Sequence, residues 1–191
     1  GGKGGSDTDQ AGEYGDIVAL CDADEGTANK KGEKFTAARK FTDFRKMFDG
    51  GVRFLYIKAS DGRDPGHNNA ERWYAADRRD AQAAGIYTGF YHFATLPDTS
   101  KTETLIADAR AQAQKVVWRL ASIGGYTNQD LPVALDLENN CVRGTLGNCK
   151  RFTSKKFVTL WAQTFLSELA AKTHRLPFVY SFPQFLEKAM I

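Results

Sequence analysis

The sequence of 191 residues has few of the side chains that bind metals. It holds three cysteines and three histidines, and no spacing typical of a metal site joins them. It also lacks an apolar run of about 18 residues, so no transmembrane helix is expected. Neither sign of charge dominates, because 26 basic residues stand against 23 acidic ones and the two kinds alternate along the chain. We therefore expect no cofactor, no membrane partner and no nucleic-acid partner.

No glycine-rich phosphate-binding fingerprint follows the first expected strand, which argues against a dinucleotide-binding fold. The sequence instead alternates β-prone apolar runs with segments of helical periodicity. Strands are expected at residues 16–23, 52–60, 86–94, 132–138 and 177–181, a loop at 24–40, and helices at 41–51, 70–85, 101–123 and 154–173. This alternation predicts parallel strands joined by crossover helices, in either an open doubly wound sheet or a barrel.

Polar side chains at the ends of several expected strands favour the barrel. They are Asp22, Lys58, His92, Asp136 with Glu138, and Tyr180. Functional residues at the carboxyl ends of many strands are typical of barrel enzymes. A complete barrel needs at least about 200 residues, and only five strands are visible. The predicted fold class is therefore α/β, a TIM-like (β/α) barrel that is incomplete at its C-terminus.

The first residues differ in character from the rest of the chain. Residues 1–15, "GGKGGSDTDQAGEYG", contain no apolar stretch of the signal-peptide kind and are predicted to be a flexible linker or tail. Residues 16–191 are predicted to form one catalytic domain, possibly truncated. We expect a monomer or a part of a larger multidomain protein.

The stretch "PVALDLENN", residues 132–140, places two acids two positions apart at the end of an apolar run. On a strand, Asp136 and Glu138 would point to one face while Leu135 and Leu137 point to the other. Two like charges this close are unfavourable, which makes them candidates for acid–base chemistry. The alternative is a solvated strand end at which Glu138 begins a loop.

The segments "FLYIKASDG", "DPGHNNAERWYAADRRDAQAAGIYTGFYHFA", "PVALDLE" and "PFVYS" occur in this order within residues 44–181. In order and spacing they resemble glycoside hydrolase family 25, the Chalaropsis-type lysozymes that include many phage endolysins. The resemblance implies a β/α barrel that cleaves the β-1,4 bond between N-acetylmuramic acid and N-acetylglucosamine in peptidoglycan. It also implies action on the bacterial cell wall by a secreted or phage-delivered protein.

The same resemblance assigns roles to single residues. It implies that Glu138 is the general acid and that Asp136 is its neighbouring carboxylate. It also implies a set of residues that bind the substrate: Lys58, Tyr91, His92 and Tyr180. For His92 we favour an orienting role over catalysis, and for Lys58 an ion pair with a carboxylate.

Acids two apart on a strand lie about 6.6 Å apart at Cα, on the same side of a bound sugar. A conventional glycosidase pair flanks the scissile bond instead. One solution is attack by the 2-acetamido oxygen of the substrate, oriented by Asp136 while Glu138 protonates the leaving oxygen. The other uses a third carboxylate from the first strand, where the family motif is degraded and Asp22 matches better than Asp16.

Two other functions remain open from the sequence. One is a catalytically impaired peptidoglycan-binding module, and the other is a hydrolase of another N-acetylated glycan such as chitin. Cys141 and Cys149 flank a short polar loop and could form a disulfide or remain two reduced thiols. Trp118 and Trp161 are expected in the core, and residues 78–80, "RRD", on a solvated helix face.

Overall fold

The computed structural model describes residues 19–21, 33–34, 39–41, 43–63, 73–144 and 148–190. Its contacts divide the chain into two compact units. Unit 1 comprises residues 1–55 and 80–86, and unit 2 comprises residues 56–79 and 87–191. The tail predicted at residues 1–15 lies outside the described residues.

Unit 1 contains a two-stranded parallel sheet made of β1 (Ala19–Cys21) and β2 (Arg39–Phe41). Strand β2 comes from the end of a segment that the sequence predicts as a loop. Helix α3 (Phe44–Asp49) follows, and its N-terminus is capped by the Asp43 side chain, which accepts a hydrogen bond from the Lys46 amide at 2.7 Å. The buried Met47 of α3 packs with Ala81 and Ile86 in a small apolar cluster of this unit.

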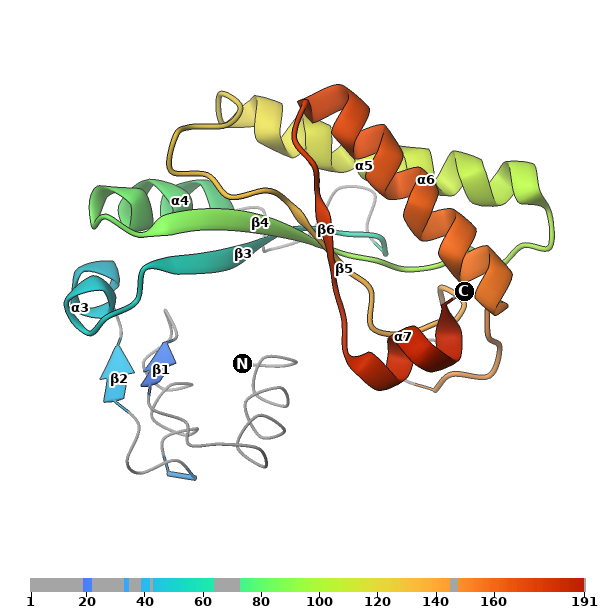
Figure 1. Cartoon of the computed structure of the whole chain (residues 1–191), viewed down its shortest axis with the longest axis horizontal. Helices are drawn as coiled ribbons and strands as arrows, with labels where there is room; N and C mark the ends of the chain where they lie inside the picture. Colours follow the sequence, from blue (N-terminus) through green and yellow to red (C-terminus); the bar gives the residue numbers. More distant parts are fainter. Residues whose placement is uncertain are drawn as a thin grey trace. The chain divides into compact units, whose positions relative to one another are not determined.

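The larger sheet carries the proposed site. Its four parallel strands follow the order β3-β4-β5-β6, and the helices α4, α5, α6 and α7 accompany them (Figure 1). The elements are β3 (Phe54–Asp61), α4 (Tyr74–Ala83), β4 (Tyr87–Phe93), α5 (Thr102–Ser122), β5 (Ala134–Asp136), α6 (Lys155–Thr173), β6 (Phe178–Tyr180) and a final helix α7 (Pro183–Ala189). The sequence therefore predicts the parallel pairing and the order of these elements correctly, whereas α7 is not anticipated.

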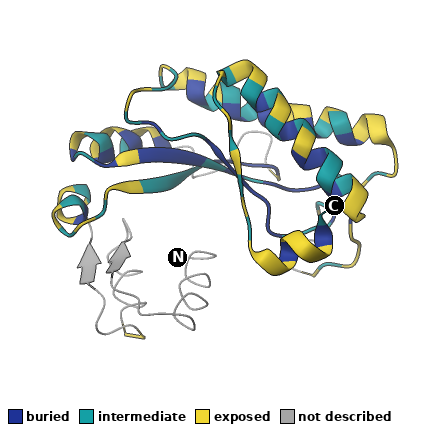
Figure 2. Ribbon diagram, viewed as in Figure 1, coloured by how far each residue is buried: buried dark blue, intermediate teal, exposed yellow. Residues whose placement is uncertain are grey.

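Helices α5 and α6 lie side by side over the sheet (Figure 1). Their buried positions recur every three or four residues, which is the pattern of an amphipathic helix. In Figure 2 the strands β4 and β5 are mostly dark blue and the helices are yellow on their outer faces. The buried helix residues are Leu105, Ala109, Ala113, Val116 and Leu120 in α5, and Val158, Trp161, Ala162, Phe165 and Leu169 in α6.

Two expectations about individual side chains, one on α5 and one on α4, need correction. Trp161 is fully buried as expected, but Trp118 is 65% exposed, because it falls on the outer face of α5. In the segment 78–80, Arg78 is buried and forms an ion pair with Asp130, and its Nε lies 3.0 Å from Asp130 Oδ1. A buried partner across the fold makes this arginine structural, which local sequence does not reveal.

The predicted α/β class and the parallel sheet are confirmed, but the barrel is not. The described sheet is open, with β3 and β6 as its two edges, because four strands cannot curve far enough to meet. None of the helices in the described part of the chain is long and apolar enough to cross a membrane.

Candidate active site

The parallel strands bring their carboxyl ends to one edge of the sheet. Phe93 of β4, Asp136 of β5 and Tyr180 of β6 are partners in the strand register. Asp61 ends β3, and the next amide, that of Gly62, donates to the Phe93 carbonyl at 2.9 Å. Neighbouring positions in a register point to the same face, so this row forms one continuous surface at the end of the sheet.

Asp136 and Glu138 are both buried, each with 8% of its surface exposed. Strand β5 ends at Asp136, and Leu137 between the two acids is fully buried. The Asp136 carbonyl accepts from the Ala94 amide at 2.8 Å, and the Leu137 amide donates to the Tyr180 carbonyl at 3.1 Å. The solvated strand end considered above therefore does not describe these acids, because their backbone is held from both sides inside the fold.

A third acid, Asp61, is the centre of a cluster of cations that the sequence analysis did not single out. Its carboxylate accepts from Lys58 Nζ at 2.8 Å and from Arg63 Nη2 at 2.6 Å. The Arg63 amide donates to it at 2.8 Å, and Lys115 Nζ donates to the Asp61 carbonyl at 2.9 Å. Burial alone would raise the pKa of Asp61, but the hydrogen bonds from Arg63 and Lys58 outweigh it and hold the pKa far below its usual range. The surrounding cations thus favour the ionised form of Asp61.

Lys58 forms an ion pair with a carboxylate, that of Asp61, as the sequence predicts. Its ammonium also lies 5.0 Å from the centre of the Phe93 ring, and the Arg63 guanidinium lies 5.3 Å from it. Because Phe93 is the register partner of Asp136, the two cations stand at the neighbouring position of the same edge. The site thus combines a compensated acid on β3 with Asp136 at the end of β5 and Glu138 just after it.

His92 is fully buried beneath this surface and stacks on Phe165, with 5.2 Å between ring centres. Its Nδ1 lies 2.7 Å from Ser60 Oγ and its Nε2 lies 2.8 Å from Gln112 Oε1. An amide oxygen only accepts, so Nε2 carries the proton and Nδ1 accepts from the serine hydroxyl. Burial lowers the pKa of His92 to about 4, despite the opposing hydrogen bond with Gln112. A neutral ring with a hydrogen bond at each of its nitrogens supports the orienting role predicted for His92.

The hydrogen bonds of Gln112 continue into helix α5 and beyond. Its Nε2 donates to the Thr95 carbonyl at 2.8 Å and to Asp108 Oδ1 at 2.7 Å. Asp108 also accepts from Trp161 Nε1 at 2.9 Å and from Arg143 Nη2 at 2.6 Å. This chain of bonds ties β4, α5, α6 and the loop after β5 together behind the acid pair, so those backbones are held rigidly.

Two glycines allow close approaches within this framework. A Cβ on Gly62 would lie 2.2 Å from Gln112 Oε1, and a Cβ on Gly89 would lie 2.1 Å from the Tyr56 ring. Tyr56 crosses Gly89, donates to the Pro132 carbonyl at 3.0 Å and meets the Phe178 ring edge-on at 5.5 Å between centres. The glycine before Phe90 in the quoted strand motif is therefore required by packing.

The remaining predicted site residues differ in how well they are placed. Tyr91 is half-buried on β4 and Tyr180 is 46% exposed on β6. Asp22 and its weaker alternative Asp16 lie outside the described residues. Cys141 and Cys149 are joined in a disulfide, which settles the choice that spacing left open. Within the described ranges, no group of three His, Cys, Asp or Glu side chains could hold a metal.

Local signals for the residues missed by the sequence analysis were weak but present. Asp61 follows a strong strand, where an acid at the carboxyl end is informative. Asp108 and Gln112 are four residues apart and occur among the apolar positions of α5. Polar residues at helical spacing on an otherwise buried face indicate a satisfied internal network.

Comparison with known proteins gives concordant results. The profile described as "Glycosyl hydrolases family 25" matches residues 37–191. An N,O-diacetylmuramidase of Arthroderma benhamiae is 34% identical over 144 residues, which cover 74% of this chain and 52% of that protein. The chain thus spans about half the length of this curated relative.

Solved structures share the fold. The lysozyme of Streptomyces coelicolor is 26% identical with a TM-score of 0.56, covering 76% of this chain and 59% of that one. The spore cortex lytic enzyme SleM of Clostridium perfringens is 22% identical with a TM-score of 0.53, over 74% of this chain and 41% of that one. The autolysin LytC of Streptococcus pneumoniae is 14% identical with a TM-score of 0.57, over 75% of this chain and 30% of that one.

Proposed function

Because the chain belongs to glycosyl hydrolase family 25, we propose that it is a muramidase that cleaves the β-1,4 bond between N-acetylmuramic acid and N-acetylglucosamine in peptidoglycan. The observation that carries the proposal is the buried pair Asp136 and Glu138 at the carboxyl edge of the sheet. The relatives named above include a muramidase and a lysozyme, which supports the same substrate class.

In the proposed reaction Glu138 is the general acid that protonates the leaving glycosidic oxygen. Asp136 orients the 2-acetamido group, whose oxygen attacks the anomeric carbon as the bond to the leaving sugar breaks. The attack forms a five-membered ring between the acetamido group and the sugar. Water then attacks the anomeric carbon and opens this ring, and the Glu138 carboxylate accepts the proton of the water. Two acids separated by one residue suit this division of work, because both approach the sugar from the same side.

Other residues of the edge would bind the glycan. Tyr180 is exposed beside Asp136 in the register, so its ring and hydroxyl can contact a sugar. Tyr91 and Lys58 are proposed as further binding residues, with His92 holding β4 in position from behind. Asp22 is proposed as a third carboxylate from the first strand, the alternative partner of Glu138.

The natural place of action is proposed to be the cell wall, reached by secretion or by phage delivery. The disulfide between Cys141 and Cys149 supports this, because disulfides persist in oxidising surroundings outside the cytoplasm.

The decisive experiment measures the loss of turbidity of a cell-wall suspension. Glu138→Gln should lower the rate at least about 10²-fold, the contribution of a positioned general acid. Glu103→Gln, which makes the same change at an exposed position of α5, is the matched control and should leave the rate unchanged. An equal rate for wild type and Glu138→Gln would reassign the acid.

The same preparation separates the two other candidate functions. Wall binding without lysis by the wild type would identify a binding module. Release of new reducing ends from chitin oligomers, and not at muramic acid, would identify a hydrolase of another N-acetylated glycan.

A further inference from the structure

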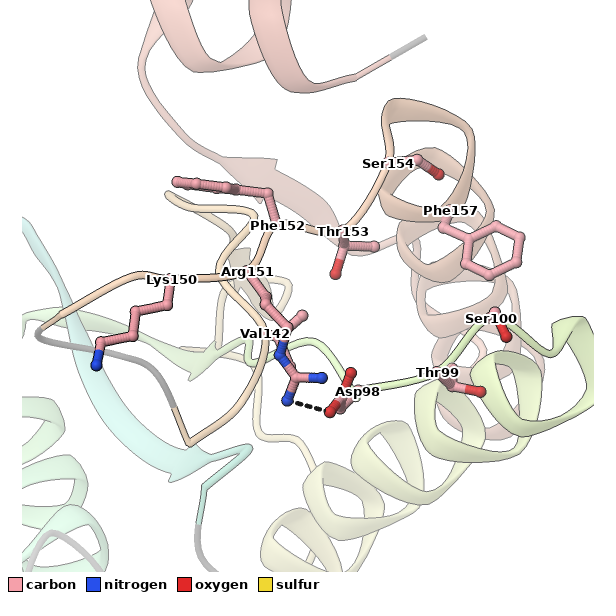
Figure 3. Close-up of a pocket in the computed structure, with 10 residues that line it drawn as sticks. All are labelled: Asp98, Thr99, Ser100, Val142, Lys150, Arg151, Phe152, Thr153, Ser154 and Phe157. Atoms are coloured by element: carbon pink, nitrogen blue, oxygen red, sulfur yellow. Dashed lines mark ion pairs between the residues drawn. The ribbon is translucent and has the colours of Figure 1, made fainter.

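A pocket of about 600 Å³ lies apart from the acid pair, beside the disulfide loop. One wall is the segment 98–100 that leads into α5, and the other is the segment 150–154 that leads into α6 (Figure 3). Val142 and Phe157 complete the lining. Among the described residues, neither Asp136 nor Glu138 lines this pocket, so it calls for a separate explanation.

The start of helix α6 is unusually positive. Ser154 is the N-cap residue, yet its side chain makes no capping hydrogen bond, and the first turn holds no acid. Lys155 and Lys156 occupy that turn instead, and Lys150 and Arg151 precede it. The N-terminus of a helix already carries unsatisfied N–H groups and a partial positive charge. Arg151 is paired with Asp98, and Lys155 Nζ donates to the Glu187 carbonyl at 3.2 Å, but the remaining positive charge at this helix start still favours a bound anion.

Thr153 points to a ligand independently of the helix. Its side chain is buried, with only 7% of the residue exposed, and its Oγ1 forms no hydrogen bond with any described residue. In Figure 3 the hydroxyl points toward the interior of the pocket. Buried hydroxyls almost always have a partner, so an acceptor from a bound molecule would complete this one.

Arg151 provides the charged donor. Its guanidinium reaches down into the same space and forms an ion pair with Asp98 (Figure 3). Asp98 neutralises part of the positive charge, but a guanidinium has five N–H donors and this pair engages Nη2. The donors that remain are suited to a second carboxylate.

We propose that this pocket binds a carboxylate of a short peptide, of the kind that the peptide stems of peptidoglycan carry. Thr153 Oγ1, the Arg151 guanidinium and the amides at the start of α6 would donate to the carboxylate. The rings of Phe152 and Phe157 would contact small apolar side chains next to it, which a phosphate lacks. The identity of the peptide rests on the proposed muramidase function, whereas the presence of the anion site does not.

The direct test is calorimetric titration of the whole protein with the dipeptide L-alanyl-D-glutamate, its fully amidated form, and inorganic phosphate. The acid form should bind, and the amidated form should bind at least about tenfold more weakly, since hydrogen bonds to charged groups are the stronger kind. Tighter binding of phosphate than of the dipeptide would overturn the choice of a peptide. No binding of either would overturn the site.

Variants locate the site. Thr153→Val keeps the shape of the side chain and should raise the Kd about tenfold without lowering the Tm, because the hydroxyl has no partner to lose. Thr153→Ser should restore binding. Arg151→Gln should also weaken binding, whereas Lys172→Gln, an equal charge change at the other end of α6, should not. An unchanged Kd in both Thr153→Val and Arg151→Gln would overturn the proposal.

Hydrolysis separates this proposal from the muramidase function. Thr153→Val should slow cleavage of peptide-bearing glycan strands while cleavage of peptide-free strands stays at the wild-type rate. Equal slowing on both substrates would contradict a peptide-binding role. If the wild type cleaves neither substrate, the muramidase proposal fails, and the titrations still decide whether the pocket binds the carboxylate.

Discussion

The two halves of the sheet edge differ in whether a cation compensates an acid or two acids lie close together. On the β3–β4 half, Asp61 is held by Lys58 and Arg63, and His92 is neutral between two hydrogen-bond partners. On the β5–β6 half, Asp136 and Glu138 are separated by one residue and lie next to the exposed Tyr180. The first half keeps its protonation states over a wide pH range, so it positions and balances charge. The second half brings two acids together at the end of β5, and these are the acids proposed to act on the substrate.

The comparison predicts its largest effect at Asp136. Asp136→Asn should lower the rate of wall lysis about 10²-fold, because the acetamido group loses its charged partner. The free energy of unfolding should stay the same or rise, since the repulsion with Glu138 disappears. Lysis assays and urea unfolding measure the two quantities. A large loss of stability would place Asp136 with the structural acids instead.

His92 should make stability depend on pH. Its pKa is about 4 in the folded protein against 6.5 for an ordinary histidine, so the unfolded chain binds the proton more readily. The free energy of unfolding should therefore be about 3 kcal/mol higher above pH 6.5 than below pH 4, and it should fall as the pH drops from 6.5 to 4. Urea unfolding at pH 7 and pH 4.5 measures it.

The variant His92→Gln is the control for this pH dependence. It should be less stable at pH 7 and should lack the decline between pH 6.5 and 4. A decline of equal size in the variant would assign it to other groups.

Asp61→Asn should mainly affect stability. Removing the charge leaves Lys58 and Arg63 without their strongest acceptor, and we expect a loss of about 2 kcal/mol, because hydrogen bonds to charged groups are involved. The pKa of Asp61 is depressed, so its contribution is present above the unfolded value of about 4 and is lost as the pH falls toward the folded value. The acid decline in wild-type stability should therefore be shallower in the variant. Asp49→Asn, on the exposed end of α3, is a matched control.

Tyr180→Phe should have the smallest effect. The phenol is exposed, and one hydrogen bond to a sugar is worth about 1 kcal/mol. We expect KM for soluble glycan fragments to rise by a factor of about five while kcat changes little. Tyr87→Phe, also exposed but at the opposite end of its strand, serves as the control.

Much of this arrangement follows from local pattern. The period-2 and period-3.6 repeats predict β3, β4, α5 and α6, and the acids at the end of "PVALDLE" predict where the proposed site lies. The error at Trp118 and the missed burial of Arg78 have one cause. Periodicity identifies an apolar face, but it does not say which residues at its margins are covered, or which charge finds a partner 52 positions away at Asp130.

The sequence by itself determined the order of strands β3 to β6 and helices α3 to α6, the position of the acid pair and the family, because these depend on neighbouring residues and their spacing. The tertiary structure decided which charges are compensated. Distance and burial give rise to the cations around Asp61 and to the neutral state of His92. They also leave the Thr153 hydroxyl without a hydrogen-bond partner among the residues that the structure describes. Both depend on how segments far apart in the chain come together, because electrostatic and hydrogen-bond energies act through space and not along the sequence.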